Sequence, residues 1–116
     1  MNYWAAPEIY FNENQNNPIN IDNDDIILKI CKYYKVSLEE LMSKSRLRRI
    51  VDARNTLYYI FHKCCNITST EVGRLFKKNH ATILSGANRI EGFMRYDKKF
   101  KRQINQIINL NTIKYN

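Results

Sequence analysis

Turn-forming residues are scarce in this sequence, which has three glycines and two prolines in 116 residues. Because both residues punctuate chains at turns, their scarcity favours helices over many short strands. No apolar run reaches the about 20 residues that a membrane-spanning helix requires. The start, MNYWAAPEIY, also lacks the basic segment and long apolar stretch of a secretion signal. We therefore expect an all-α protein in the cytoplasm, with no membrane partner.

Cysteine is also rare and its spacing is uninformative. Cys31, Cys64 and Cys65 are an odd number, and the vicinal pair has neither the C-x-x-C spacing of a zinc or redox site nor a set of histidines nearby. We expect buried free thiols, no metal and no cofactor. His62 and His80 lack a nucleophile partner and the acids are scattered, so the sequence does not indicate an enzyme.

A phosphate-binding loop is missing. The pattern G-x-x-x-x-G-K-[ST] does not occur, and 116 residues leave no room for a nucleotide-hydrolysing domain beside another. The chain length fits one domain with a modest core. We expect no nucleotide among the partners.

Acidic residues are scarce after residue 25, and this scarcity carries information. Residues 1–25 contain five acids and no Lys or Arg, whereas residues 26–116 contain all 19 basic residues and only six acids. The net charge of +8 therefore hides a body of formal charge +13. Such a body attracts polyanions, and nucleic acid is the expected one because no stretch is amphipathic in the manner of a membrane anchor.

The chain divides into an arm and a helical body. Residues 1–23 are acidic and rich in Asn, without helical periodicity, so we expect a flexible or loosely packed arm whose large apolar residues, such as Trp4 and Tyr10, could dock on the body. Residues 24–116 show the spacing of about six helices. Their expected spans are 24–35, a short helix capped by Ser37 and ending near Ser43, a central helix over 47–65, a helix from Thr68 to near Lys77, a fifth ending near Tyr96 and a sixth ending near Asn111.

The segment from residue 68 to residue 90 has the outline of a helix-turn-helix. A short helix, a three-residue turn containing Lys77 and Lys78, and a longer helix follow one another, with Gly73 allowing close approach. The second helix of such a motif enters the major groove with its N-terminal residues at base edges. With Ile83, Ala87, Ile90 and Met94 facing the core, the residues left to read bases are Asn79, His80, Ala81, Thr82 and Ser85. Asn79 is also the expected helix cap.

A second group of residues strengthens this interpretation. The segment SKSRLRRIVDAR places five basic residues around the start of the central helix, with only Asp52 among them. Guanidinium groups on a loop can enter a minor groove while others bind phosphates. The five are Lys44, Arg46, Arg48, Arg49 and Arg54.

Together, YYKVSLEELMSKSRLRRIVDARNTLYYIF and STEVGRLFKKNHATILSGANRI resemble the C-terminal DNA-binding domain of DnaA, the bacterial chromosomal replication initiator. The resemblance covers roughly residues 24–100. It implies a helical bundle of the DnaA domain IV and Trp repressor type that binds double-stranded DnaA boxes. By position, Arg46 matches the minor-groove arginine, Lys44 and Arg48 lie beside it, and Arg54 with Asn55 matches a phosphate-binding Arg-Gln pair. Asn79, His80, Ala81 and Thr82 match the family's Asp-His-Thr-Thr.

The departures from the family leave the role open. Asn79 and Ala81 replace an acid and a hydroxyl residue, and the turn is one residue shorter than the common F-G-G-R-D-H form, with Lys77 and Lys78 adding phosphate contacts. The resemblance implies a stand-alone DnaA-type domain, of the kind a phage or mobile element could encode, in replication initiation, its regulation or transcription. The alternative is a protein-interaction module that binds or antagonises host replication proteins.

Overall fold

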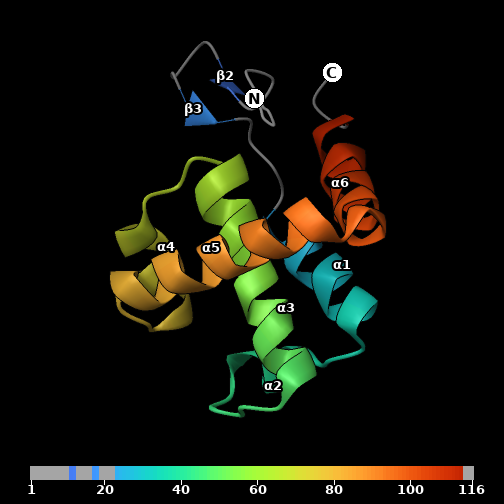
Figure 1. Ribbon diagram of the computed structural model, residues 1–116. Coiled ribbons are helices and arrows are strands. Elements are labelled where there is room, and N and C mark those ends of the chain that lie inside the picture. The colour runs from blue at the N-terminus through green and yellow to red at the C-terminus, as the bar shows by residue number, and fades with distance from the viewer. Residues whose placement is uncertain (1–10, 13–16, 19–22, 114–116) are drawn as a thin grey trace.

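The computed structural model describes residues 11–12, 17–18 and 23–113 (Figure 1). Its described part contains the helices α1 (Asn23–Tyr34), α2 (Leu38–Met42), α3 (Arg48–Tyr59), α4 (Ser69–Phe76), α5 (His80–Tyr96) and α6 (Lys98–Ile113), with a π-helical segment, η2 (Ile60–Cys64), continuing α3. Two short strands, β2 (Phe11–Asn12) and β3 (Asn17–Pro18), pair antiparallel. The expected all-α bundle of about six helices is confirmed. The predicted docking of the arm's aromatic residues lies outside the described residues.

The helix starts follow the capping signals in the sequence. Before α2, the Glu40 N–H donates to Ser37 Oγ at 3.0 Å and the Ser37 N–H donates to the Glu40 carboxylate at 2.9 Å, a complete capping box. Before α4, the Glu71 N–H donates to Thr68 Oγ1 at 3.2 Å, but the Glu71 carboxylate accepts from the Thr68 hydroxyl instead of the backbone. The capping box before α4 is therefore only half formed.

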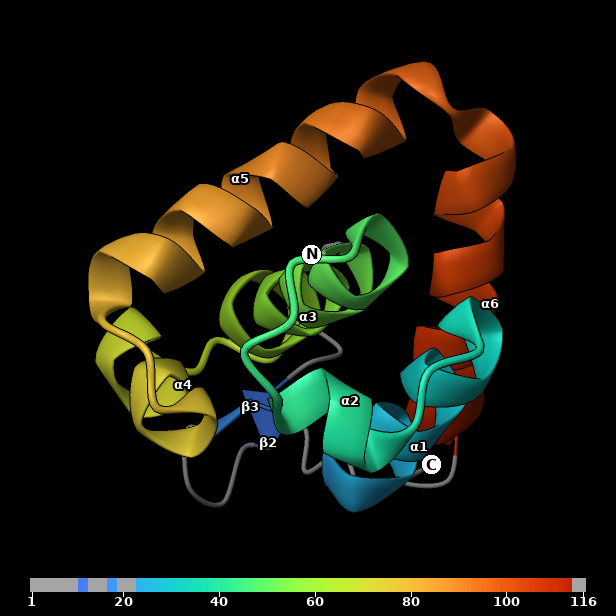
Figure 2. The same ribbon diagram turned by 90° about the horizontal axis from the view of Figure 1, so that it is seen from below.

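The core is built around α3, which Figure 2 shows almost end-on in the middle of the other helices. Helices α1, α2 and α5 all pack against it. The predicted stripe of Ile50, Ala53, Leu57, Ile60 and Phe61 is buried. Burying each large apolar side chain of this kind stabilises the fold by about 1.5–3 kcal/mol. One predicted helix over residues 47–65 is thus correct in extent, but its last turn widens into η2.

The predicted apolar face of α5 is also confirmed. Ile83, Ala87, Ile90 and Met94 are buried, which orients the helix about its axis and turns its opposite face outward. At Asp97 the chain turns a corner into α6 (Figure 2). None of the helices in the described ranges is long and apolar enough to cross a membrane.

Candidate nucleic-acid interface

The turn between α4 and α5 consists of Lys77, Lys78 and Asn79. Lys77 adopts the left-handed conformation with φ 58°, and the Lys78 N–H donates to the Gly73 carbonyl at 2.8 Å. A Cβ on Gly73 would collide with the Lys78 carbonyl oxygen. Glycine is therefore required for a close approach, as expected, but the partner is the backbone of the turn and not the body of α5.

The first turn of α5 presents small polar groups to solvent. Asn79 has extended backbone dihedrals, and its side-chain oxygen accepts from the Thr82 N–H at 2.9 Å, so the predicted helix cap is confirmed. His80, Ala81, Thr82 and Ser85 are all exposed. A helix N-terminus with exposed side chains and free N–H groups is suited to base edges and phosphates.

A hollow of about 390 Å³ lies beside this turn. Its lining includes Asn79, Ala81, Thr82 and Ser85, all expected at base edges. Asn55 from α3 forms part of the wall and is only 9% exposed. A Cβ on Gly86 would collide with Asn55 Oδ1 and approach Tyr58 Cδ2 to 2.8 Å, so glycine lets α5 lie directly on the side chains of α3.

The loop from Ser43 to Leu47, here called the basic loop, is shaped by serine hydroxyl groups. The Ser45 N–H donates to Ser43 Oγ at 3.1 Å and the Leu47 N–H donates to Ser45 Oγ at 3.2 Å. Lys44, Arg46 and Arg48 are exposed, and no hydrogen bond or ion pair engages their side chains within the part of the chain that the structure describes. These cations are available to a ligand.

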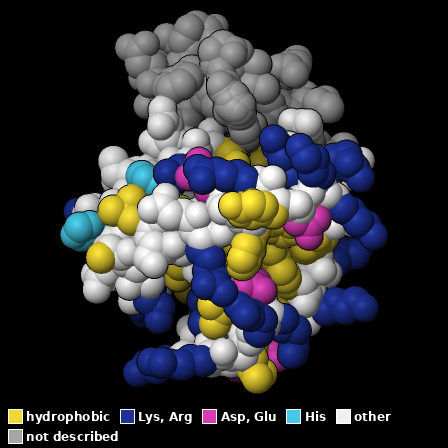
Figure 3. Space-filling model, in the orientation of Figure 1, with side chains coloured by type: hydrophobic (Ala, Val, Ile, Leu, Met, Phe, Trp, Pro, Cys, Tyr) yellow, Lys and Arg dark blue, Asp and Glu magenta, His cyan; other side chains and the backbone are white. Residues whose placement is uncertain are grey.

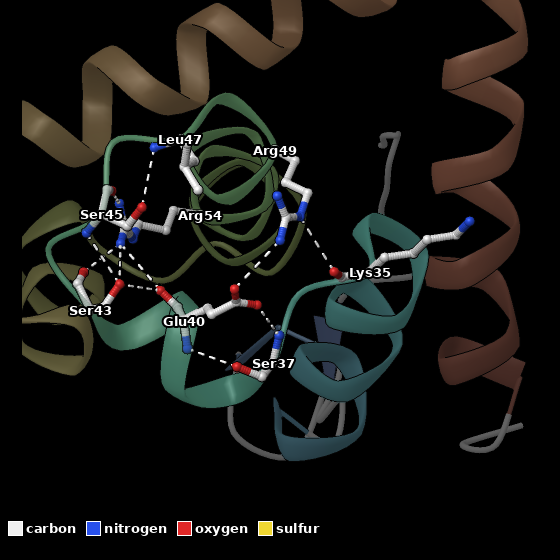
Figure 4. Close-up of polar contacts among 8 residues, drawn as sticks. All are labelled: Lys35, Ser37, Glu40, Ser43, Ser45, Leu47, Arg49 and Arg54. Atoms are coloured by element: carbon white, nitrogen blue, oxygen red, sulfur yellow. Dashed lines mark hydrogen bonds and ion pairs between the residues drawn. The ribbon is translucent and has the colours of Figure 1, made fainter.

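Arg49 is only partly available. Its guanidinium lies 3.4 Å from the Glu40 carboxylate and donates a long bond of 3.5 Å to the Lys35 carbonyl (Figure 4). Half of the Arg49 side chain is nevertheless exposed. A surface ion pair of this kind is worth less than about 1 kcal/mol and can exchange for a phosphate.

Arg54 is buried and contacts the basic loop from within the protein. It is 8% exposed, and its guanidinium lies inside the basic loop (Figure 4). Nε donates to the Leu41 carbonyl at 2.7 Å, Nη1 to the Ser45 carbonyl at 2.7 Å, and Nη2 to the carbonyls of Ser43 and Glu40. All three nitrogens thus bind backbone carbonyls of the protein, and the phosphate contact expected of Arg54 stays a prediction.

The two predicted surfaces are neighbours. Arg54 holds the basic loop, and the next residue, Asn55, lines the hollow beside Thr82. Both ribbon views place the basic loop and the start of α5 on the side of α3 that faces α4 and away from α6 (Figures 1 and 2). One ligand can therefore contact both.

Arg89 also lines the hollow, although it was not among the site residues predicted from the sequence. Its guanidinium lies 5.2 Å from the centre of the Phe93 ring, a cation–π contact. The signal was present, because Ser85 and Arg89 are four residues apart and share the face opposite the buried stripe.

The cysteines offer no alternative chemistry. All three are free and buried, as expected. Burial raises the pKa of the Cys65 thiol to about 12 and also raises the pKa of Cys64 well above its usual value. Both thiols therefore stay protonated near neutral pH and are poor nucleophiles. Within residues 23–113 and the two short strands, no group of three or more His, Cys, Asp or Glu could hold a metal ion.

Comparison with known proteins agrees with the helix-turn-helix outline of α4 and α5. The family model described as bacterial dnaA protein helix-turn-helix matches residues 23–90. Similar proteins include the chromosomal replication initiator protein DnaA of Oleidesulfovibrio alaskensis, 33% identical over 90 residues, which make up 78% of this chain and 20% of that protein. That of Aquifex aeolicus is 31% identical over 80 residues, 68% of this chain and 20% of that protein. The chain thus spans about a fifth of the length of these relatives.

Proposed function

Since the chain belongs to the family of the bacterial DnaA helix-turn-helix domain, we propose that it binds double-stranded DNA through the start of α5 and the basic loop. The observation that carries the proposal is the exposure of Ala81, Thr82 and Ser85 beside a hollow whose wall includes Asn55, the residue that follows the loop-binding Arg54. Small and hydroxyl-bearing side chains can approach base edges closely, and the Thr methyl and Ala can contact thymine.

The two surfaces have different tasks in this proposal. The residues assigned to base edges in the major groove are Asn79, His80, Ala81, Thr82 and Ser85, with Arg46 in the adjacent minor groove. Lys44, Arg48, Arg49, Asn55, Lys77 and Lys78 bind phosphates, which fix the register without reading sequence. Arg54 acts indirectly, by holding the loop that carries Arg46.

The preferred sites are DnaA-box-like sequences, and the setting is replication initiation, its regulation or transcription. In this setting the chain would occupy boxes that a full-length initiator also recognises. No nucleotide is required for the proposed binding, because the groups involved are side chains and helix N–H groups.

Selection of bound duplexes from a random pool tests the proposal. Recovery of a DnaA-box-like motif is the expected result, whereas a pool that stays random or fails to bind contradicts sequence-specific binding. Thr82→Ala and His80→Ala should then each cost about 1–3 kcal/mol on the selected site and little on random duplex. Because both side chains are exposed, these changes should leave folding intact. Equal losses on both duplexes would mean that these residues do not read bases.

A further inference from the structure

A second hollow, of about 380 Å³, lies at the corner where α5 meets α6. Five aromatic rings line it: Tyr33, Tyr34, Phe93, Tyr96 and Phe100. Two carboxylates complete the lining, Asp52 from α3 and Asp97 at the corner. The two hollows share no lining residue, and Thr82 and Tyr96 are 14 positions apart on α5, about 21 Å along the helix.

One carboxylate oxygen of Asp52 accepts no hydrogen bond from the described residues. This oxygen, Oδ1, is buried. The Thr56 hydroxyl donates to the Asp52 backbone carbonyl at 2.8 Å, so the Tyr34 hydroxyl must donate to Thr56 and cannot serve the carboxylate. The Tyr33 hydroxyl donates to Gln103. Because a buried unpaired carboxylate oxygen is costly, a positive charge held close to Asp52 in the hollow would be favoured.

The rim of this hollow is unusually apolar for a surface. Tyr96 is 88% exposed and Phe93 is 38% exposed. Asp97 uses one carboxylate oxygen to accept the Phe100 N–H at 3.0 Å and is itself exposed. Ring faces together with carboxylates are the environment that binds ammonium and guanidinium groups. One of these rings already contacts a cation in this chain, since Arg89 lies over Phe93.

We propose that this hollow, the aromatic–aspartate hollow, binds a single Lys or Arg side chain of a partner protein. Its two carboxylates are among only six acids in residues 26–116, so it is an acidic point on a body of charge +13. Figure 3 shows the molecule from the same side as Figure 1. Near the centre of this view, hydrophobic side chains have acidic ones beside them, and Lys and Arg side chains surround them. A segment with one basic anchor and acidic flanks matches that arrangement, because its flanks can pair with exposed cations such as Lys98, Lys99 and Lys101.

Other occupants fit less well. DNA phosphates would be repelled by Asp52 and Asp97. The arm of a second copy cannot supply the anchor, since residues 1–25 contain no Lys or Arg. Phe93, Tyr96, Asp97 and Phe100 lie beyond residues 23–90, which match the family model, whereas Tyr33, Tyr34 and Asp52 lie within them. A partner here would leave the DNA-binding surface free.

Two synthetic peptides test the proposal by NMR titration of the whole chain. One is acetyl-Gly-Glu-Ser-Arg-Ser-Glu-Gly-amide, and the other carries citrulline, an uncharged isostere, in place of arginine. The arginine peptide should shift the backbone amides of Asp52, Phe93 and Asp97, and the citrulline peptide should bind about tenfold more weakly. Equal affinities, no shifts, or shifts confined to the start of α5 would overturn the proposal.

Two variants locate the interaction. Tyr96→Ser removes an exposed ring without disturbing the core, and Asp52→Asn removes a charge at constant shape. Each should weaken the arginine peptide severalfold, while Tyr96→Ser should bind DNA as the parent chain does. Unchanged peptide affinity in both variants would also overturn the proposal, whatever the DNA result.

Discussion

Arg54 donates to carbonyls before and within the basic loop, those of Glu40 and Leu41 in α2 and those of Ser43 and Ser45 in the loop itself. Its planar guanidinium has five N–H donors in fixed directions, so one side chain satisfies several carbonyls at once. A lysine ammonium cannot reproduce this geometry. The presentation of Arg46 therefore depends on a residue that is itself hidden.

Arg54→Ala should lower the free energy of unfolding by about 2–3 kcal/mol, because buried carbonyls lose charged donors. DNA affinity should fall while the slope of log affinity against log salt stays unchanged, since no phosphate contact is lost. Urea denaturation and salt titration of duplex binding measure the two effects. The control, Arg48→Ala, is exposed and should change stability by less than about 0.5 kcal/mol but make the slope shallower by about 0.9. If Arg54→Ala made the slope shallower by the same amount, Arg54 would contact a phosphate, as the sequence predicts.

Lys77 has a left-handed backbone, which is unfavourable for a residue with a Cβ. Lys77→Gly should raise the free energy of unfolding by about 1 kcal/mol, measured by urea denaturation. Lys78→Gly is the matched control, because Lys78 is not among the described residues with positive φ and glycine there adds only unfolded-state entropy. Both variants lose one positive charge, so a difference in stability reports the backbone alone. Equal stabilities would show that Lys77 carries no strain.

At the scale of elements, the angle between α4 and α5 depends on the contact of Gly73 with the turn. Gly73→Ala would place a methyl group against the Lys78 carbonyl oxygen, so the turn must move. We expect a loss of about 1–3 kcal/mol in unfolding free energy and weaker DNA binding. Thermal unfolding and gel shift of the selected duplex measure these changes.

Gly92 provides the control for this prediction. It lies in α5, and a Cβ there would meet nothing within 4 Å. Gly92→Ala should therefore stabilise the protein by up to about 1 kcal/mol, through helix propensity. If both alanine variants were stabilising, the close contact at Gly73 would not be limiting.

At the scale of the whole molecule, the proposed interface draws its cations from a body of formal charge +13, and these cations are Lys44, Arg46, Arg48, Arg49, Lys77 and Lys78. If five to eight phosphates are contacted, log affinity should fall with log salt with a slope of about −4 to −7. A salt titration of duplex binding by fluorescence anisotropy measures it. A slope near zero would contradict an interface of basic residues and favour a partner protein as the main ligand.

The helices, their caps and the buried stripes could be predicted from the sequence, because they depend on neighbours three or four residues apart in the chain. Ser37, Thr68, Asn79 and the apolar face of α5 were all predictable in this way. The widening into η2 was not, since a single helix and its π-helical variant share nearly the same apolar spacing.

Which polar residues remain available to a ligand depends on how the helices and loops pack, and the sequence did not show it. In the sequence, Arg54 cannot be told apart from the other cations of the basic segment. Its burial depends on carbonyls 9–14 residues earlier in the chain. The two hollows likewise join residues from distant helices, such as Asn55 with Thr82 and Asp52 with Tyr96. Local patterns cannot specify such pairs, because these side chains meet only when packing of the core fixes how the helices cross.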